Sequence, residues 1–126
     1  MKKSDIKNAF KQFPKPIFNT VDDIKNQGYE FESVDYVIPN IEKLAKKMND
    51  TIEGVILDID ASLESGWVTV KLREEYQGYN YVFISIDDIE ERIVNFIQDK
   101  LNVDFDEKID EYVRYQCEDK IVNWFL

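Results

Sequence analysis

Two carboxylates, Asp58 and Asp60, are the residues of this chain whose types and spacing could do chemistry. They stand two positions apart in an apolar run, which places both on one side of a strand. Together with Glu64 they could bind Ca²⁺ or Mg²⁺ through oxygen ligands. The chain has no histidine and one cysteine, Cys117, which excludes His-dependent triads, His-ligated metals and Cys-rich zinc sites. We expect Cys117 to be a packing residue, and we expect no cofactor, no bound metal and no enzymatic activity.

The nine residues Val55 to Leu63 resemble the first motif of the haloacid dehalogenase phosphatases, an apolar strand followed by Asp-x-Asp. The resemblance implies that Asp58 attacks phosphorus, that Asp60 is an acid/base and that Mg²⁺ neutralises charge. That family usually has Gly-Thr after the second Asp and carries the motif on a parallel sheet. This chain has Ala61-Ser62 there, and two further strands follow almost at once. A metal-dependent hydrolase that uses Asp58 and Asp60 is therefore a further alternative, not the leading interpretation.

The charge of the chain is strongly negative and unevenly distributed. The net charge is −10. Residues 1–50 carry 9 basic and 8 acidic side chains, whereas residues 51–126 carry 7 basic and 18 acidic ones. A field of this sign repels nucleic acid and anionic membranes and attracts a basic partner. We therefore expect a basic protein as partner, with no direct nucleic-acid binding and no membrane binding.

Most of the acidic side chains that could contact such a partner lie in or beside the predicted strands. Charge runs of this kind are also typical of solvated faces that keep a protein soluble. Because one loop and one helix flank the third strand at opposite ends, the carboxylates would form a row along the sheet. The predicted partner-binding residues are Asp58, Asp60, Glu64, Glu74, Glu75, Asp87, Asp88, Glu90 and Glu91.

Aromatic side chains on the same strands indicate a second surface. Trp67, Tyr79, Tyr81 and Phe83 are expected to share one face of the sheet. A base-stacking platform would need positive surroundings, which the acidic chain does not supply. Two interpretations stay open, a core covered by the N-terminal helices and a protein-binding face.

Period-two alternation with β-branched and aromatic residues predicts strands at about 55–61, 67–73 and 79–86. Their connections are short and end in Gly66 and Gly78. Short loops predict an antiparallel meander, because a parallel return needs a longer crossover. We expect Val55, Leu57 and Ile59 to share one face of the first strand.

Short helical segments are predicted before the sheet. Residues 4–13 form one, capped by Ser4, and residues 21–27 form another, capped by Thr20 and closed by Gly28. Tyr29 and Phe31 indicate an extended piece. A third helix is expected from Pro39 or Asn40 to about Met48.

Two longer helices are predicted after the sheet. The first begins with Asp87 as N-cap and Glu90 three residues on, and ends at Asn102. The second follows an Asp104–Glu107 box and continues to the C-terminus. This pair should cover the sheet face formed by Val55, Val70 and Ile84.

The sequence as a whole predicts one α+β domain, residues 1–126: a three-stranded antiparallel meander, short N-terminal helices and two longer C-terminal helices. A single cysteine and no apolar leader favour a cytoplasmic location. The leading functional hypothesis is an inhibitor that blocks a basic nucleic-acid-binding partner by mimicking nucleic-acid charge, of the phage anti-CRISPR or anti-restriction type. The alternative is an immunity protein that neutralises a toxin nuclease. A homodimer through Trp124-Phe125-Leu126 is a further hypothesis.

Overall fold

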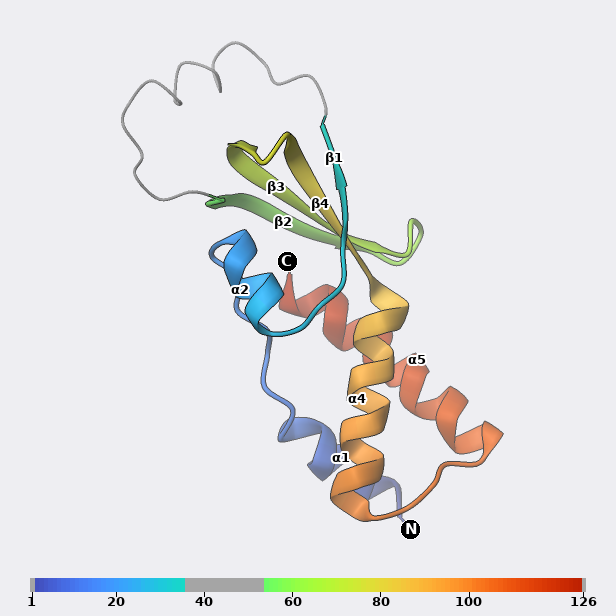
Figure 1. Cartoon of the computed structure of the whole chain (residues 1–126). Helices are drawn as coiled ribbons and strands as arrows, with labels where there is room; N and C mark the ends of the chain where they lie inside the picture. Colours follow the sequence, from blue (N-terminus) through green and yellow to red (C-terminus); the bar gives the residue numbers. More distant parts are fainter. Residues whose placement is uncertain (1, 36–53, 126) are drawn as a thin grey trace.

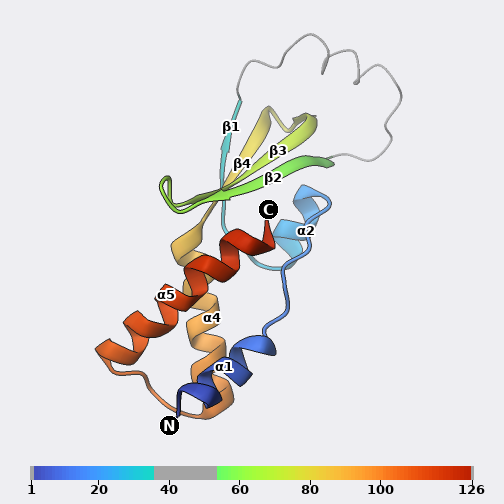
Figure 2. The same cartoon turned by 180° about the vertical axis from the view of Figure 1, so that it is seen from behind.

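The computed structural model describes residues 2–35 and 54–125 and has an α+β fold. A four-stranded antiparallel sheet has the strand order β1-β4-β3-β2. Figures 1 and 2 show the sheet at one end of the molecule and helices α1, α4 and α5 extending away from it. The elements are α1 (Lys3–Lys11), α2 (Val21–Asn26), β1 (Glu32–Val34), β2 (Ile56–Ser62), β3 (Trp67–Tyr76), β4 (Tyr79–Ser85), α4 (Ile86–Leu101) and α5 (Glu107–Trp124).

The predicted meander is confirmed as β2, β3 and β4, but the prediction of three strands was wrong by one. Strand β1 pairs with β4, with Glu32 opposite Phe83 and Val34 opposite Tyr81. It has only three residues, too few for an alternating pattern to stand out in the sequence. The third predicted helix, from Pro39 to about Met48, lies outside the described residues.

The two faces of the sheet differ sharply in burial. Val68, Val70, Val82 and Ile84 are fully buried and form the aliphatic face. On the opposite face the side chains in the regularly paired part of β3 and β4 are only half-buried: Trp67, Thr69, Lys71, Tyr81 and Phe83. The sheet therefore has one face in the core and one face that the described residues leave partly open.

A β-bulge makes the alternation of side chains along β2 differ from the predicted one. The pairing shifts between Ile56 and Asp58, so Leu57 is the extra residue and is 51% exposed. Ile59 lies opposite Val70 on the aliphatic side, and Ile56 joins it there instead of Leu57. The side chains of Asp58 and Asp60 consequently remain together on the open face.

The aliphatic face is covered by segments from both ends of the chain, not by the C-terminal helix pair alone. Helix α2 reaches the sheet where the Val21 amide donates to the Gly54 carbonyl over 2.9 Å. The end of α5 arrives from the other side, and Phe125 stacks on Phe18 with centroids 6.2 Å apart. Figures 1 and 2 both show α2 and the C-terminal end of α5 beneath the sheet. Helix α4 begins directly after β4, at Ile86, and leads away from the sheet.

Two helix boundaries were predicted correctly, the start of α2 and the end of α4. Thr20 caps α2 as expected and accepts from the Asp23 amide, and Asn102 ends α4 in the left-handed conformation. Three N-caps were wrong by two residues, because the chain uses Lys2, Ser85 and Asp106 in place of Ser4, Asp87 and Asp104. Asp87 lies instead in the first turn of α4, where the helix dipole favours a negative charge.

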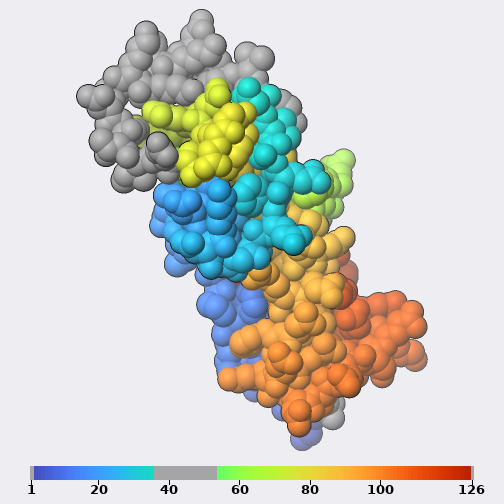
Figure 3. All heavy atoms as spheres, viewed as in Figure 1, coloured from blue at the N-terminus to red at the C-terminus, as the bar shows by residue number. Residues whose placement is uncertain are grey.

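Arg92 of α4 fixes the connection between α2 and β1. Its guanidinium stands 3.8 Å from the centroid of the Tyr29 ring and donates to the carbonyls of Gln27 (2.9 Å) and Gly28. In Figure 3 the α2–β1 segment (blue to cyan) lies against the first turns of α4 (light orange). One side chain thus satisfies two carbonyls and directs the chain into β1.

We expect Arg92→Lys to lower the free energy of unfolding by about 1–2 kcal/mol, because an ammonium cannot donate to both carbonyls while covering the ring. Urea denaturation measures the change. Arg114→Lys is the matched control. Arg114 pairs with carboxylates only, Asp110 and Glu91, to which an ammonium can also donate, so this variant should lose less than about 0.5 kcal/mol. Equal losses in the two variants would contradict the role assigned to Arg92.

Candidate functional site

Asp58 and Asp60 are both exposed on the open face of β2, at the edge of the sheet. Asp58 lies opposite Lys71, and Asp60 lies opposite Thr69. Within the described residues, no group of three or more His, Cys, Asp or Glu side chains is arranged to hold a metal ion. The strand that carries the two aspartates belongs to an antiparallel sheet, unlike the parallel sheet of the phosphatases that the motif resembles.

The remaining predicted carboxylates divide between the two ends of the sheet. The Ile86 amide donates to the Gly66 carbonyl over 3.0 Å, which brings the β2–β3 turn with Glu64 to the start of α4, where Asp87 and Asp88 lie. Glu74 and Glu75 lie near the β3–β4 turn at the opposite end. These carboxylates therefore form two groups at opposite ends of the sheet.

Glu74 is less available than the sequence suggests. It is half-buried, and its Oε1 is buried without a hydrogen-bond partner in the part of the chain that the structure describes. Its neighbour Glu75 is exposed. A surface contact at this end is therefore carried better by Glu75.

Glu90 was predicted to contact a partner, but the structure places it among the buried residues. It is only 4% exposed and lies on the side of α4 that faces α5, whereas Glu91 points outward and its Oε2 is 3.7 Å from Arg114. Burial raises the pKa of the Glu90 carboxyl to about 7, and the negative charges of Glu118 and Asp87 add to the rise. Arg114 acts in the opposite direction.

Cys117 is fully buried, which agrees with the expected packing role. Burial raises the pKa of its thiol to about 12, and the nearby Glu90 contributes to the rise. A thiol in this environment stays protonated and does not act as a nucleophile near neutral pH.

The aromatic side chains divide between the core and the open face. Trp67 and Phe83 meet edge to face with centroids 6.2 Å apart, and Tyr81 stacks beside Phe83 at 6.5 Å. Tyr79 does not belong with them, because it is buried and contacts Tyr76 edge to face at 5.8 Å. The pairing of β3 with β4 shifts between Lys71 and Tyr76, which separates the strand end from the regular face.

A hollow lies beside the Trp67–Phe83 corner, where the sheet meets α4 and the residues before β1. Its volume is about 160 Å³. Three carboxylates and three aromatic rings surround it, and no lysine or arginine lines it. The lining residues are Glu30, Phe31, Glu32, Trp67, Phe83, Ser85 and Asp88.

Of these lining carboxylates, only Asp88 was predicted from the sequence. Glu30 and Glu32 were missed because their place beside Phe83 depends on the short strand β1. The alternation Glu30-Phe31-Glu32 was the available signal, since it places two carboxylates on one side of an extended segment. None of these three carboxylates forms an ion pair within the described residues.

The residues proposed for a homodimer contact pack within the chain. Trp124 stacks on Phe13 with centroids 6.0 Å apart, and Phe125 stacks on Phe18. Leu126 lies outside the described residues.

Comparisons of the chain with protein families, curated proteins and solved structures find no match. In the part of the chain that the structure describes, none of the helices combines the length and the apolar character needed to cross a membrane. The hollow and its three carboxylates therefore have to be interpreted from their own geometry.

We expect the buried Glu90 to make stability depend on pH. Its pKa in the folded state lies above its ordinary value of 4.5, so the folded state holds the proton more tightly. The resulting stabilisation is complete below about pH 4.5 and is lost as the pH rises through about 7. Glu90→Gln is neutral at every pH. It should therefore be more stable than the wild type near pH 8 by about 2 kcal/mol, and this difference should shrink near pH 5.

Urea denaturation at the two pH values measures this difference. Glu111→Gln is the matched control, because Glu111 is an exposed glutamate of α5 and its substitution should leave the pH dependence of the wild type unchanged. The same pH dependence in the Glu90→Gln variant and the wild type would refute the assignment.

Proposed function

We propose that this protein binds a basic nucleic-acid-binding protein and blocks it by occupying its nucleic-acid surface. The observation that carries the proposal is the hollow beside Trp67 and Phe83, where three carboxylates without ion pairs surround aromatic rings. A nucleic-acid-binding surface displays lysine and arginine side chains that normally contact phosphates. The carboxylates of the hollow offer these basic side chains a negative charge, as phosphates do.

The chemistry of the hollow favours an arginine side chain of the partner. A guanidinium can lie flat on an aromatic ring while its N–H groups donate to carboxylates on either side. The Trp67–Phe83 corner supplies two ring surfaces at an interplanar angle of 73°. Glu32 and Asp88 line the same hollow and supply the acceptors. The molecule already uses this type of contact internally, between Arg92 and Tyr29.

The surroundings of the hollow resemble the organisation of protein interfaces. Aromatic residues are enriched at interface centres, and polar residues form the rim. Here Tyr81 and Phe83 lie on the inner strand β4 and Trp67 lies at the start of the inner strand β3, while Asp58 and Asp60 lie on the edge strand β2. The net charge of −10 would in addition speed the encounter with a basic partner.

We expect tagged protein in a lysate of its native host to capture a basic nucleic-acid-binding protein that is retained at low salt and weakened at high salt. The captured protein, once purified, should lose nucleic-acid binding when this protein is added. A nuclease of a defence system would indicate an anti-restriction type of inhibitor, and a toxin nuclease would indicate an immunity protein. An empty eluate would contradict the proposal.

A pair of charge-matched variants separates a specific site from general acidity. Glu32→Gln with Asp88→Asn should weaken binding of the captured protein by roughly 30-fold, since losing one side of a desolvated charge pair costs about 2 kcal/mol or more. Asp104→Asn with Glu111→Gln removes the same charge at exposed positions outside the hollow and should have little effect. Equal effects of the two double variants would show that the hollow is not the contact.

A further inference from the structure

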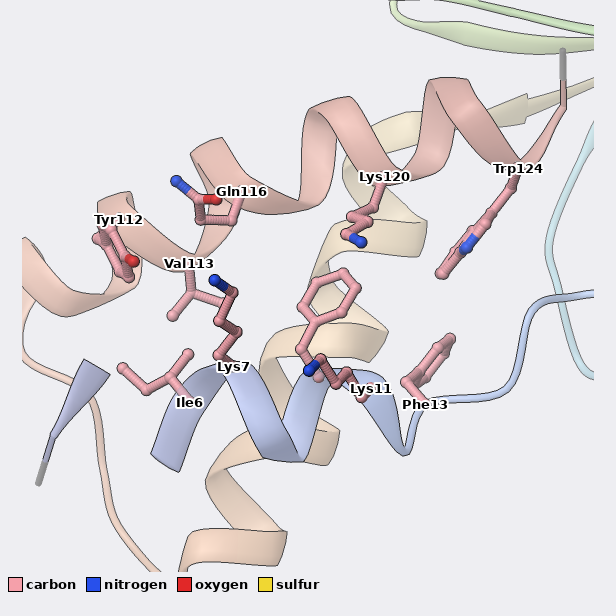
Figure 4. A pocket seen from close by; sticks show the side chains of 10 residues that line it. Ile6, Lys7, Lys11, Phe13, Tyr112, Val113, Gln116, Lys120 and Trp124 are labelled. Carbon is pink, nitrogen blue, oxygen red and sulfur yellow. The ribbon is translucent and has the colours of Figure 1, made fainter. Parts of the chain in front are cut away.

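A groove between α1 and α5 is unlike the rest of this acidic molecule. Figure 4 shows that its side chains come from both helices. Its volume is about 360 Å³, and Phe10, Phe13, Val113 and Trp124 give it an apolar lining. Phe13 and Trp124 are nearly parallel, with centroids 6.0 Å apart, and close one end. No described carboxylate lines the groove.

Three lysines converge on this apolar lining. Lys7 and Lys11 come from α1, and Lys120 comes from α5. Lys7 and Lys11 are spaced i, i+4, where two like charges destabilise a helix. The chain has 26 acidic and 16 basic residues, yet none of these lysines forms an ion pair in the part of the molecule that the structure describes. The positive charge at the groove is therefore not neutralised internally.

The size and lining of the groove suit a small ligand. Small-molecule sites have volumes of about 300–1,000 Å³ and are mostly apolar with a few polar groups that fix orientation. The groove lies near the lower end of this range and has cations as its charged groups. An anionic membrane is a less suitable occupant than a small anion. Its extended surface would also meet the acidic faces of this molecule, whereas a small anion meets only the groove.

We propose that this groove binds a small amphiphilic anion with an apolar body and a single carboxylate-type head. The body lies against Phe10, Phe13 and Trp124, and the head contacts the ammonium groups of Lys7, Lys11 and Lys120. The groove shares no lining residue with the hollow beside Trp67. The inference is therefore independent of the proposed inhibitor function.

Octanoate is a suitable probe, and the two tryptophans allow its binding to be located. In a ¹⁵N-labelled sample, the indole N–H signal of Trp124 should shift in a saturable manner as octanoate is added up to tens of millimolar. The signal of Trp67, which lies on the sheet, should stay in place. Octanol and octylammonium test the charge of the head and should bind at least about tenfold more weakly, because neither offers the lysines an anion.

Lysine variants test the head-group contact without disturbing the apolar lining. Lys7→Gln with Lys11→Gln should weaken octanoate binding by about tenfold, which corresponds to about 1.4 kcal/mol. Lys100→Gln with Lys108→Gln removes the same charge from exposed positions outside the groove and should leave the affinity unchanged.

Several outcomes would overturn the inference: no saturable shift of the Trp124 signal, equal shifts of both tryptophan signals, binding of octanol as tight as that of octanoate, or equal effects of the two double variants.

Discussion

The aliphatic face of the sheet has to be kept from water, and the arrangement of the other elements follows from this constraint. Val68, Val70, Val82 and Ile84 are fully buried, so burying the face contributes several kcal/mol of hydrophobic stabilisation. The sheet is formed by the middle of the chain, and its cover comes from α2 on one side and the end of α5 on the other. Arg92 then fixes the chain between α2 and β1, which adds the fourth strand.

The sequence was sufficient for the regular parts of this fold and insufficient where tertiary pairing decides. Period-two patterns located β2, β3 and β4, because alternation is a local property. The residues before β1 show a short alternation, but the strand itself depends on its pairing with β4. The exposed position of Leu57 depends on a bulge that the sequence pattern does not show. Glu90 was assigned to an acidic surface run, although it is buried in the structure. The sequence does not show how α4 and α5 pack, and this packing decides which side of α4 is buried.

The candidate site could be predicted only in part for the same reason. Asp88 was among the predicted contact residues, and Trp67 and Phe83 were predicted to share a face. Glu30 and Glu32 complete the hollow from a segment far away in the sequence, which only the sheet topology brings there. The lysine-lined groove was missed because its three lysines come from opposite ends of the chain, and composition reports only their sum.

The contact between Phe18 and Phe125 has a consequence for how the protein forms during synthesis. These two rings stack although they come from opposite ends of the described chain. The strands emerge from the ribosome well before α5, so the apolar face of the sheet lacks this part of its cover until α5 has been synthesised. We therefore expect the nascent chain to be most prone to aggregation in the interval between the synthesis of β4 and the release of α5.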